Sequence, residues 1–166
     1  VIATPKSMLR NKLAVSRPED FTASKWRPVL GDPSTADPSK VRRILVCSGK
    51  VRWELVKERE RLGLQAQVAI ITLERLFPKP ISELVAELAL YPQVTDVRWV
   101  QEEPVNRGPW EFLQVHLVPE MSQALGREFT LRPVARPMGA ADSTGSPAVH
   151  LREQQELLTA AMGDLA

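Results

Sequence analysis

The chain has few of the side chains that form covalent or metal cross-links, with one cysteine and two histidines among 166 residues. A single cysteine excludes an internal disulfide, and with two histidines it does not readily complete a structural zinc site. The net charge is +2, well short of the basic excess of nucleic-acid-binding proteins. We therefore expect no metal site and no nucleic-acid partner.

Long hydrophobic runs are also missing. No apolar stretch reaches the roughly 18 residues of a membrane span, so no membrane partner is expected. The opening Val1-Ile2-Ala3-Thr4-Pro5 lacks both an initiator methionine and the basic and apolar segments of a signal peptide. Apolar residues make up 43% of the chain and charged residues 25%, which are values typical of one globular domain. The single cysteine favours a reducing compartment, and we expect a cytoplasmic protein.

Proline is abundant by contrast, with 14 residues against 8 glycines. Residues 1–40 hold five of the prolines and carry seven basic against four acidic side chains, a net charge of +3. Because proline lacks an N–H donor, we predict that 1–40 is a basic, irregular connector on the surface and that 41–166 is the globular domain. Phe21 and Trp26 argue against disorder and predict that the connector packs on its own domain or on a neighbour.

Beyond residue 40, short apolar runs alternate with helical patterns. The expected elements are a strand at 41–47, a helix at 50–62, a strand at 67–73, a helix at 81–88, a strand at 94–103, a helix at 110–117 that Pro119 bends or ends, and a strand at 129–135. A last helix is capped by Ser146, and its apolar stripe of Leu151, Leu158 and Ala161 is broken by Gln154. This alternation predicts an α/β fold with a mainly parallel sheet covered by helices on both faces. Ligands of such sheets bind at the carboxyl ends of the strands.

One loop at such an end has the residues of an anion site. Ser48-Gly49-Lys50 lies between an expected strand and an expected helix, where backbone donors and a lysine could hold a phosphate. A single glycine is not a phosphate-binding loop motif, so an ordinary tight turn remains the alternative. Arg136-Pro137 with Ser143-Thr144-Gly145-Ser146 forms a second small-residue loop, which could bind an anion or, as we slightly favour, contact a neighbouring subunit.

Other reactive residue types have structural interpretations. Glu102 and Glu103 are adjacent in a strand and point to opposite faces, so they cannot share one acid/base site. Cys47 lies in a buried-strand pattern and is expected in the core. His116 and His150 have no partner pattern that would form a catalytic triad. The sequence therefore predicts no catalytic, cofactor-binding or metal-binding residue on this chain.

Four motifs in succession resemble one known family. They are Thr4 to Lys12, Ser48-Gly49-Lys50 with Glu54-Leu55, Gln101-Glu102-Glu103-Pro104 with Asn106 and Gly108, and Arg136-Pro137 with Thr144-Gly145-Ser146, His150 and Glu153-Gln154-Gln155. Together they resemble the C-terminal part of the decarboxylase component of thiamine-dependent 2-oxoglutarate dehydrogenases. The residues of the first and last motifs most resemble those of the actinobacterial multifunctional 2-oxoglutarate metabolism enzymes.

This resemblance implies a three-layer, transketolase-type C-terminal domain within a larger enzyme. Thiamine diphosphate, magnesium and the catalytic histidines then belong to preceding domains of the same polypeptide, and the fragment alone is inactive. The resemblance also implies a homodimer, acyltransferase and dihydrolipoyl dehydrogenase components as partners, and regulation by acetyl-CoA and an FHA-domain protein. The effector would contact Arg10, Lys12, Ser48, Gly49 and Lys50.

The sequence departs from the family pattern in two places. Arg52-Trp53 replaces a pair of aromatics after the Gly-Lys turn, and Asp142 stands in a loop that is usually uncharged. The first change affects any ligand contact on that helix, and the second places an acid where a phosphate would approach. A stand-alone α/β module that senses a nucleotide or coenzyme A remains the alternative function.

Overall fold

The computed structural model describes residues 1, 4–35 and 37–165, so the part of the Val1–Pro5 interpretation that concerns Ile2 and Ala3 lies outside it. Its elements in chain order are η1 (Lys6–Met8), α1 (Pro18–Thr22), β1 (Val29–Leu30), η2 (Pro38–Lys40), β2 (Arg43–Cys47), α2 (Val51–Arg61), β3 (Val68–Leu73), α3 (Ile81–Leu88), β4 (Asp96–Pro104), α4 (Trp110–Phe112), η3 (Leu113–Leu117), α5 (Val118–Leu125), β5 (Arg132–Arg136), α6 (Pro147–Met162) and η4 (Gly163–Leu165).

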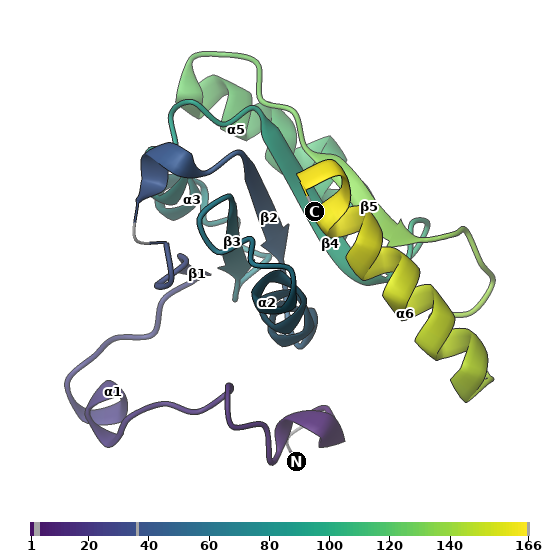
Figure 1. Ribbon diagram of the computed structural model, residues 1–166. Coiled ribbons are helices and arrows are strands. Elements are labelled where there is room, and N and C mark those ends of the chain that lie inside the picture. Colours follow the sequence, from purple (N-terminus) through teal and green to yellow (C-terminus); the bar gives the residue numbers. More distant parts are fainter. Residues whose placement is uncertain (2–3, 36, 166) are drawn as a thin grey trace.

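One five-stranded sheet organises the chain in the order β1-β3-β2-β4-β5 (Figure 1). The pairs β2–β3, β2–β4 and β4–β5 are parallel, and only the short edge strand β1 is antiparallel to its neighbour. The α/β fold with a mainly parallel sheet is therefore confirmed.

The sheet separates two hydrophobic cores, which explains the continuous apolar runs of the central strands. Ile44 and Val46 of β2 face the core formed with α3, α4 and α5, whereas Leu45 and Cys47 face the core formed with α2 and α6. A strand buried on both faces needs apolar residues at every position. The result is three layers, helices, sheet and helices, and Cys47 lies in the core as predicted.

The helix after Trp110 differs from the prediction. It does not end at Pro119 but runs through a π-helical turn at η3 into α5, which ends at Leu125 before Gly126. A proline inside a helix lacks an N–H donor and crowds the carbonyl four residues earlier, here that of Val115. The wider π turn over Leu113–Leu117 accommodates Pro119 in the first turn of α5.

Two further details of the prediction were wrong. Strand β5 begins at Arg132 and not at residue 129, because the Phe129 N–H donates to the Ser122 hydroxyl at 3.0 Å and leaves the ladder. The buried stripe of α6 contains Gln154, Leu157, Ala161 and Met162, whereas Leu151 is exposed. Gln154 is buried because its amide bridges Arg136 and Glu54, a contact that apolar periodicity does not reveal.

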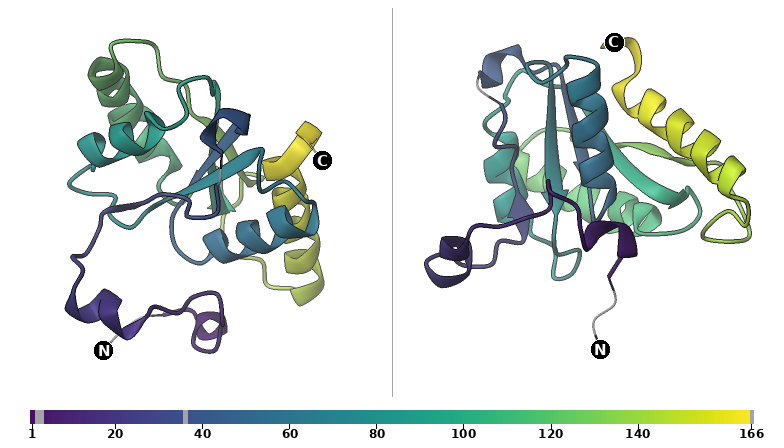
Figure 2. Two further views of the ribbon diagram at one scale, coloured as in Figure 1. Left: turned by 60° about the vertical axis from the view of Figure 1, so that its left-hand side comes forward. Right: turned by 60° about the horizontal axis from the view of Figure 1, so that its bottom comes forward.

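Residues 4–27 extend below the three layers, away from the sheet (Figures 1 and 2). Phe21 and Trp26 are 79% and 65% exposed, so the connector does not bury them on its own domain. Residues 28–34 behave differently: β1 joins the sheet edge, and Asp32 reaches Arg59 of α2. The domain boundary at residue 40 stays a prediction.

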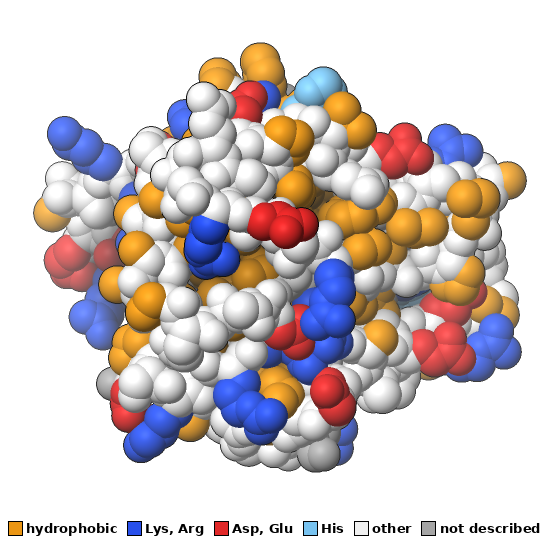
Figure 3. Space-filling view, turned by 90° about the horizontal axis from the view of Figure 1, so that it is seen from above, with side chains coloured by type: hydrophobic (Ala, Val, Ile, Leu, Met, Phe, Trp, Pro, Cys, Tyr) orange, Lys and Arg blue, Asp and Glu red, His pale blue; other side chains and the backbone are white. Residues whose placement is uncertain are grey.

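Charged side chains of both signs are mixed on the face of the molecule that is at the top in Figure 1 and is seen from above in Figure 3. Blue and red groups alternate there, and neither sign covers the face (Figure 3). The amino ends of the parallel strands point toward this side, while their carboxyl ends point toward the connector (Figure 1). No helix among the described residues is long and apolar enough to cross a membrane.

Candidate functional site

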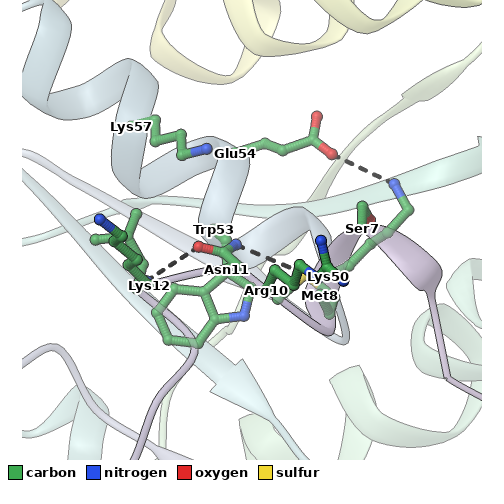
Figure 4. A pocket seen from close by; sticks show the side chains of 10 residues that line it. Ser7, Met8, Arg10, Asn11, Lys12, Lys50, Trp53, Glu54 and Lys57 are labelled. Atoms are coloured by element: carbon green, nitrogen blue, oxygen red, sulfur yellow. Dashed lines mark hydrogen bonds and ion pairs between the residues drawn. The ribbon is translucent and has the colours of Figure 1, made fainter.

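The strongest candidate site lies at the carboxyl edge of the sheet, between the connector and α2. A cavity of about 500 Å³ opens there, within the 300–1,000 Å³ typical of small-molecule sites. Its lining residues are Ser7, Met8, Arg10, Asn11, Lys12, Leu13, Lys50, Trp53, Glu54 and Lys57 (Figure 4). The fold thus brings η1 and the residues after it beside a helix forty positions further along the chain.

The cavity is basic. Four cationic side chains line it, namely Arg10, Lys12, Lys50 and Lys57, against the single carboxylate of Glu54. Arg10, Lys12 and Lys57 are exposed, and no ion pair involving them is present among the described residues. These three side chains are therefore free to bind an anion.

Lys50 is in a different state from the other three. Its ammonium group bonds to the carboxylates of Glu102 and, at 3.3 Å, Glu54. Burial on its own would lower the pKa of Lys50, but the bond to Glu102 and the charges of Glu102 and Glu54 outweigh burial and raise this pKa. Lys50 therefore stays charged, and its charge is already balanced by two acids.

The turn before α2 depends on glycine. Gly49 has φ +74°, a left-handed conformation that costs other residues about 1 kcal/mol or more. Lys50 follows as the N-cap of α2 and makes no side-chain capping bond. Gly49 lines a neighbouring cavity, described below, whereas Ser48 is not among the lining residues of either cavity.

Trp53 lines both the basic cavity and a neighbouring one, as do Met8 and Lys50. The second has a volume of about 390 Å³ and is lined by Gly49, Lys50, Arg52 and Trp53 together with residues of the connector. The Arg52 guanidinium lies 5.5 Å from the Trp53 ring centroid and donates to the Thr72 hydroxyl. Arg52 and Trp53, the two residues that depart from the family pattern, are therefore part of this site. Trp53 presents an aromatic surface to both cavities.

The remaining candidates have the positions expected from the sequence. Glu102 bonds to Lys50, whereas Glu103, on the opposite face of β4, lies next to Gly108. Burial raises the pKa of the Cys47 thiol to about 12, so it is not a nucleophile near neutral pH. His116 packs on Phe112 with ring centroids 5.2 Å apart, and His150 contacts Arg136. Over the described ranges, no three His, Cys, Asp or Glu side chains form a metal-binding group.

Sequence reasoning missed Lys57. Its position follows from helical geometry, since residues 50, 53, 54 and 57 share one face of a helix. Applying the i, i+3, i+4, i+7 rule to Lys50 would have identified both Trp53 and Lys57. The approach of Arg10 and Lys12 to this face could not have been predicted from spacing.

The fold and the cavity define a class: a three-layer α/β domain with a mostly parallel sheet and a basic cavity at its carboxyl edge. Within that class, a family model described as the 2-oxoglutarate dehydrogenase C-terminal domain matches residues 15–162. The chain belongs to this family.

Curated relatives agree with the assignment. The chain is 43% identical over 159 residues to a 2-oxoglutarate dehydrogenase E1/E2 component of Corynebacterium glutamicum, covering 95% of this chain and 13% of the relative. It is 42% identical over 167 residues to a multifunctional 2-oxoglutarate metabolism enzyme of Mycolicibacterium vanbaalenii, covering 98% and 13%. A 2-oxoglutarate dehydrogenase E1 component of Coxiella burnetii is 39% identical over 163 residues, covering 98% and 17%. The chain thus spans only about an eighth to a sixth of these proteins.

Proposed function

We propose that this chain is the C-terminal domain of a cytoplasmic, thiamine-dependent enzyme that decarboxylates 2-oxoglutarate. The family match over residues 15–162 and the names of the relatives carry this proposal. Thiamine diphosphate and magnesium are then held by preceding domains, and this chain alone is inactive. Its proposed partners are those domains, a second copy of the polypeptide, and the acyltransferase and dihydrolipoyl dehydrogenase components.

The exposed large apolar side chains of the connector support contact with preceding domains. Leu9, Val15, Phe21 and Trp26 are 65% to 79% exposed on a segment that is otherwise basic and proline-rich. Four large apolar side chains exposed within 18 residues of one segment favour an interface over a free surface. We place the preceding domains of the same polypeptide on this surface.

Truncation tests this function. The polypeptide that carries this chain should form a dimer and decarboxylate 2-oxoglutarate only when thiamine diphosphate is present. Removal of the chain should lower both the dimer content, measured by analytical ultracentrifugation, and the rate of carbon dioxide release. Equal dimer content and equal rate in the truncated protein would contradict the proposed supporting role.

We also propose that the basic cavity binds acetyl-CoA as an effector. Arg10, Lys12 and Lys57 offer charges for the phosphates of coenzyme A, and Trp53 offers a surface on which its adenine could stack. The proposal differs from the sequence-based ligand set in the role given to each residue. Lys50 is expected to orient Glu54 and Glu102, while Arg10 and Lys57 make the phosphate contacts.

Calorimetric titration of acetyl-CoA measures how much each of these residues contributes to binding. Arg10→Ala and Lys57→Ala should each weaken binding about fivefold to tenfold, because each removes one charged contact of about 1 to 1.5 kcal/mol. Lys50→Ala should weaken binding less than either. Arg42→Ala is the matched control, since Arg42 is exposed and precedes β2 at the opposite end of the sheet. Equal losses in all four variants, or no heat with the wild-type chain, would contradict the assignment.

A further inference from the structure

We propose that Gln154 is a positioning residue that holds the carboxylate of Glu54 away from the cations that bind the anion in the basic cavity. Glu54 is the one acid among the described lining residues of that cavity, and Gln154 does not line it. The role rests on the proposed effector site and adds to it a residue that controls affinity without touching the ligand.

Gln154 is buried where α6 packs against α2, and the residue is 7% exposed. Its side-chain Nε2 donates to Oε2 of Glu54 at 2.6 Å, and its Oε1 accepts from Arg136 at 2.8 Å. The orientation of this amide is fixed, because an arginine can only donate and an ionised carboxylate can only accept. Gln154 therefore joins the end of β5 to the first turn of α2 in one defined arrangement.

Arg136 anchors the amide from the side opposite the cavity. It is the last residue of β5 and is 5% exposed. Its guanidinium also contacts His150 at 3.0 Å and forms an ion pair with Glu153 at 3.7 Å. A buried cation with several partners at the end of a strand has little freedom to move, so the amide that it holds stays in one position.

Both oxygens of the Glu54 carboxylate are engaged in this arrangement. Oε2 accepts from Gln154, and Oε1 accepts from the Lys50 ammonium at 3.3 Å (Figure 4). Lys50 also bonds to Glu102 of β4. Glu54 thus occupies a fixed place in a chain of hydrogen bonds that runs from β5 through α6 and α2 to β4.

Release of Glu54 would create a competitor for the ligand. Lys57 follows Glu54 by three residues on α2, a spacing at which opposite charges pair on a helix surface. Among the described residues, Glu54 nevertheless forms no ion pair with Lys57, Arg10 or Lys12. Its side chain is 35% exposed and has room to turn once the bond to Gln154 is lost. A carboxylate paired with Lys57 would cancel one of the three charges available to a polyanion.

Gln154→Glu breaks this bond while it preserves the size of the side chain. The new carboxylate still accepts from Arg136, but it repels Glu54 in place of donating to it. Calorimetric titration with inorganic pyrophosphate should show affinity about twofold to fivefold weaker than in the wild type, the range expected for partly exposed charge pairs. The chain has its own core on each face of the sheet, so the isolated 166 residues suit this measurement.

Gln155→Glu is the matched control for the added charge. Gln155 is the next residue on α6, is exposed, and contacts Glu58 at 3.5 Å and not Glu54. Its affinity for pyrophosphate should stay within a factor of about 1.5 of the wild type, because a single exposed charge outside the cavity is screened by solvent. An equal loss in Gln154→Glu and Gln155→Glu would overturn the proposal.

A Glu54→Gln background separates positioning from charge. Glu54→Gln alone should strengthen pyrophosphate binding about twofold to fivefold by removing a like charge. Gln154→Glu should then have no effect beyond that of the control, because no carboxylate remains at position 54 to be released. A plain charge effect would weaken binding by the same factor in both backgrounds, and such additivity would contradict the positioning role.

Gln154→Met removes the donor without adding a charge. It should weaken binding in the wild-type background and leave it unchanged in the Glu54→Gln background, and thermal unfolding of each variant checks that the fold is retained. Absence of pyrophosphate binding by the wild-type chain would overturn the proposed effector site together with this role. Binding of equal strength in the wild type, Gln154→Glu and Gln154→Met would overturn the role of Gln154 alone.

Discussion

Asp32→Ala is expected to destabilise the protein by about 3 to 5 kcal/mol, the usual cost of leaving one partner of a buried ion pair alone. The side chains of Asp32 and Arg59 are 3% and 2% exposed. The Asp32 carboxylate also accepts from the Ile70 N–H at 2.8 Å, and Ser34 bonds to both members of the pair. Without Asp32, the Arg59 charge stays buried with only the Val68 carbonyl and the Ser34 hydroxyl as acceptors.

Urea unfolding followed by circular dichroism measures this loss. Asp37→Ala is the matched control: Asp37 and its partner Lys40 are 45% and 67% exposed, and the change removes only an exposed cap bond to the Ser39 N–H, so its midpoint should move much less. Similar midpoints for Asp32→Ala and Asp37→Ala would contradict the assignment of Asp32 to the core of the fold.

Acid should remove the stabilisation that the Asp32–Arg59 pair gives the wild-type protein. Burial on its own would raise the pKa of Asp32, but the hydrogen bonds from Arg59 and Ser34 and the Arg59 charge outweigh it and hold this pKa below its usual value. The contribution is complete above the unfolded carboxyl pKa of about 3.9 and is lost as pH falls through the lower folded pKa. The difference in the free energy of unfolding between the wild type and Asp32→Ala should therefore become smaller in acid.

Asp96→Asn is the second large expected effect, a loss of about 2 to 3 kcal/mol, which is less than the roughly 3 to 5 kcal/mol typical of fully buried pairs because this side chain is 20% exposed. Its carboxylate accepts from Arg43 at 2.7 Å, from Arg98 at 3.0 Å and from Arg132. Arg43 is 2% exposed and also bonds to the Ala161 and Met162 carbonyls at the end of α6. One carboxylate therefore holds the amino ends of the strands and the last helix together.

Thermal unfolding of Asp96→Asn beside Asp142→Asn provides the comparison. Asp142 is 76% exposed and 3.7 Å from its partner, so the same chemical change there should leave the midpoint unmoved. Burial on its own would raise the pKa of Asp96, but the three arginines outweigh it and hold this pKa far below its usual range. The cost of Asp96→Asn should accordingly persist at mildly acidic pH and disappear only in strong acid. Equal midpoints for the two variants near neutral pH would refute the role of Asp96.

Much of the fold could be predicted because local patterns carry it. The apolar runs at 41–47 and 67–73 predicted strands covered on both faces, and the spacing of Ile81, Leu84, Val85 and Leu88 predicted α3. The π turn before Pro119 was missed because it depends on the three-dimensional accommodation of one proline ring. Gln154 was predicted only as a break in the apolar stripe of the last helix, because the bonds that let it be buried come from Arg136 and Glu54, which are distant in sequence.

The candidate site was only partly predictable for the same reason. Gly49 and Lys50 follow from a strand-to-helix turn, but the two acids that bind Lys50 come from the next turn of α2 and from β4. The pairing of Asp32 with Arg59 joins a proline-rich segment to a helix 27 residues away, and no periodicity reports it. Long-range ion pairs of this kind are properties of the folded chain.

The antiparallel edge strand has a mechanical consequence for the polypeptide. Val29 and Leu30 pair with Leu73 and Thr72, and the Glu74 N–H donates to the Pro28 carbonyl at 2.9 Å. A pull on the connector along its own direction would load these bonds in shear, together with the Asp32–Arg59 pair just behind them. Tension on the connector would thus be borne at the edge of the sheet before it reached the two cores.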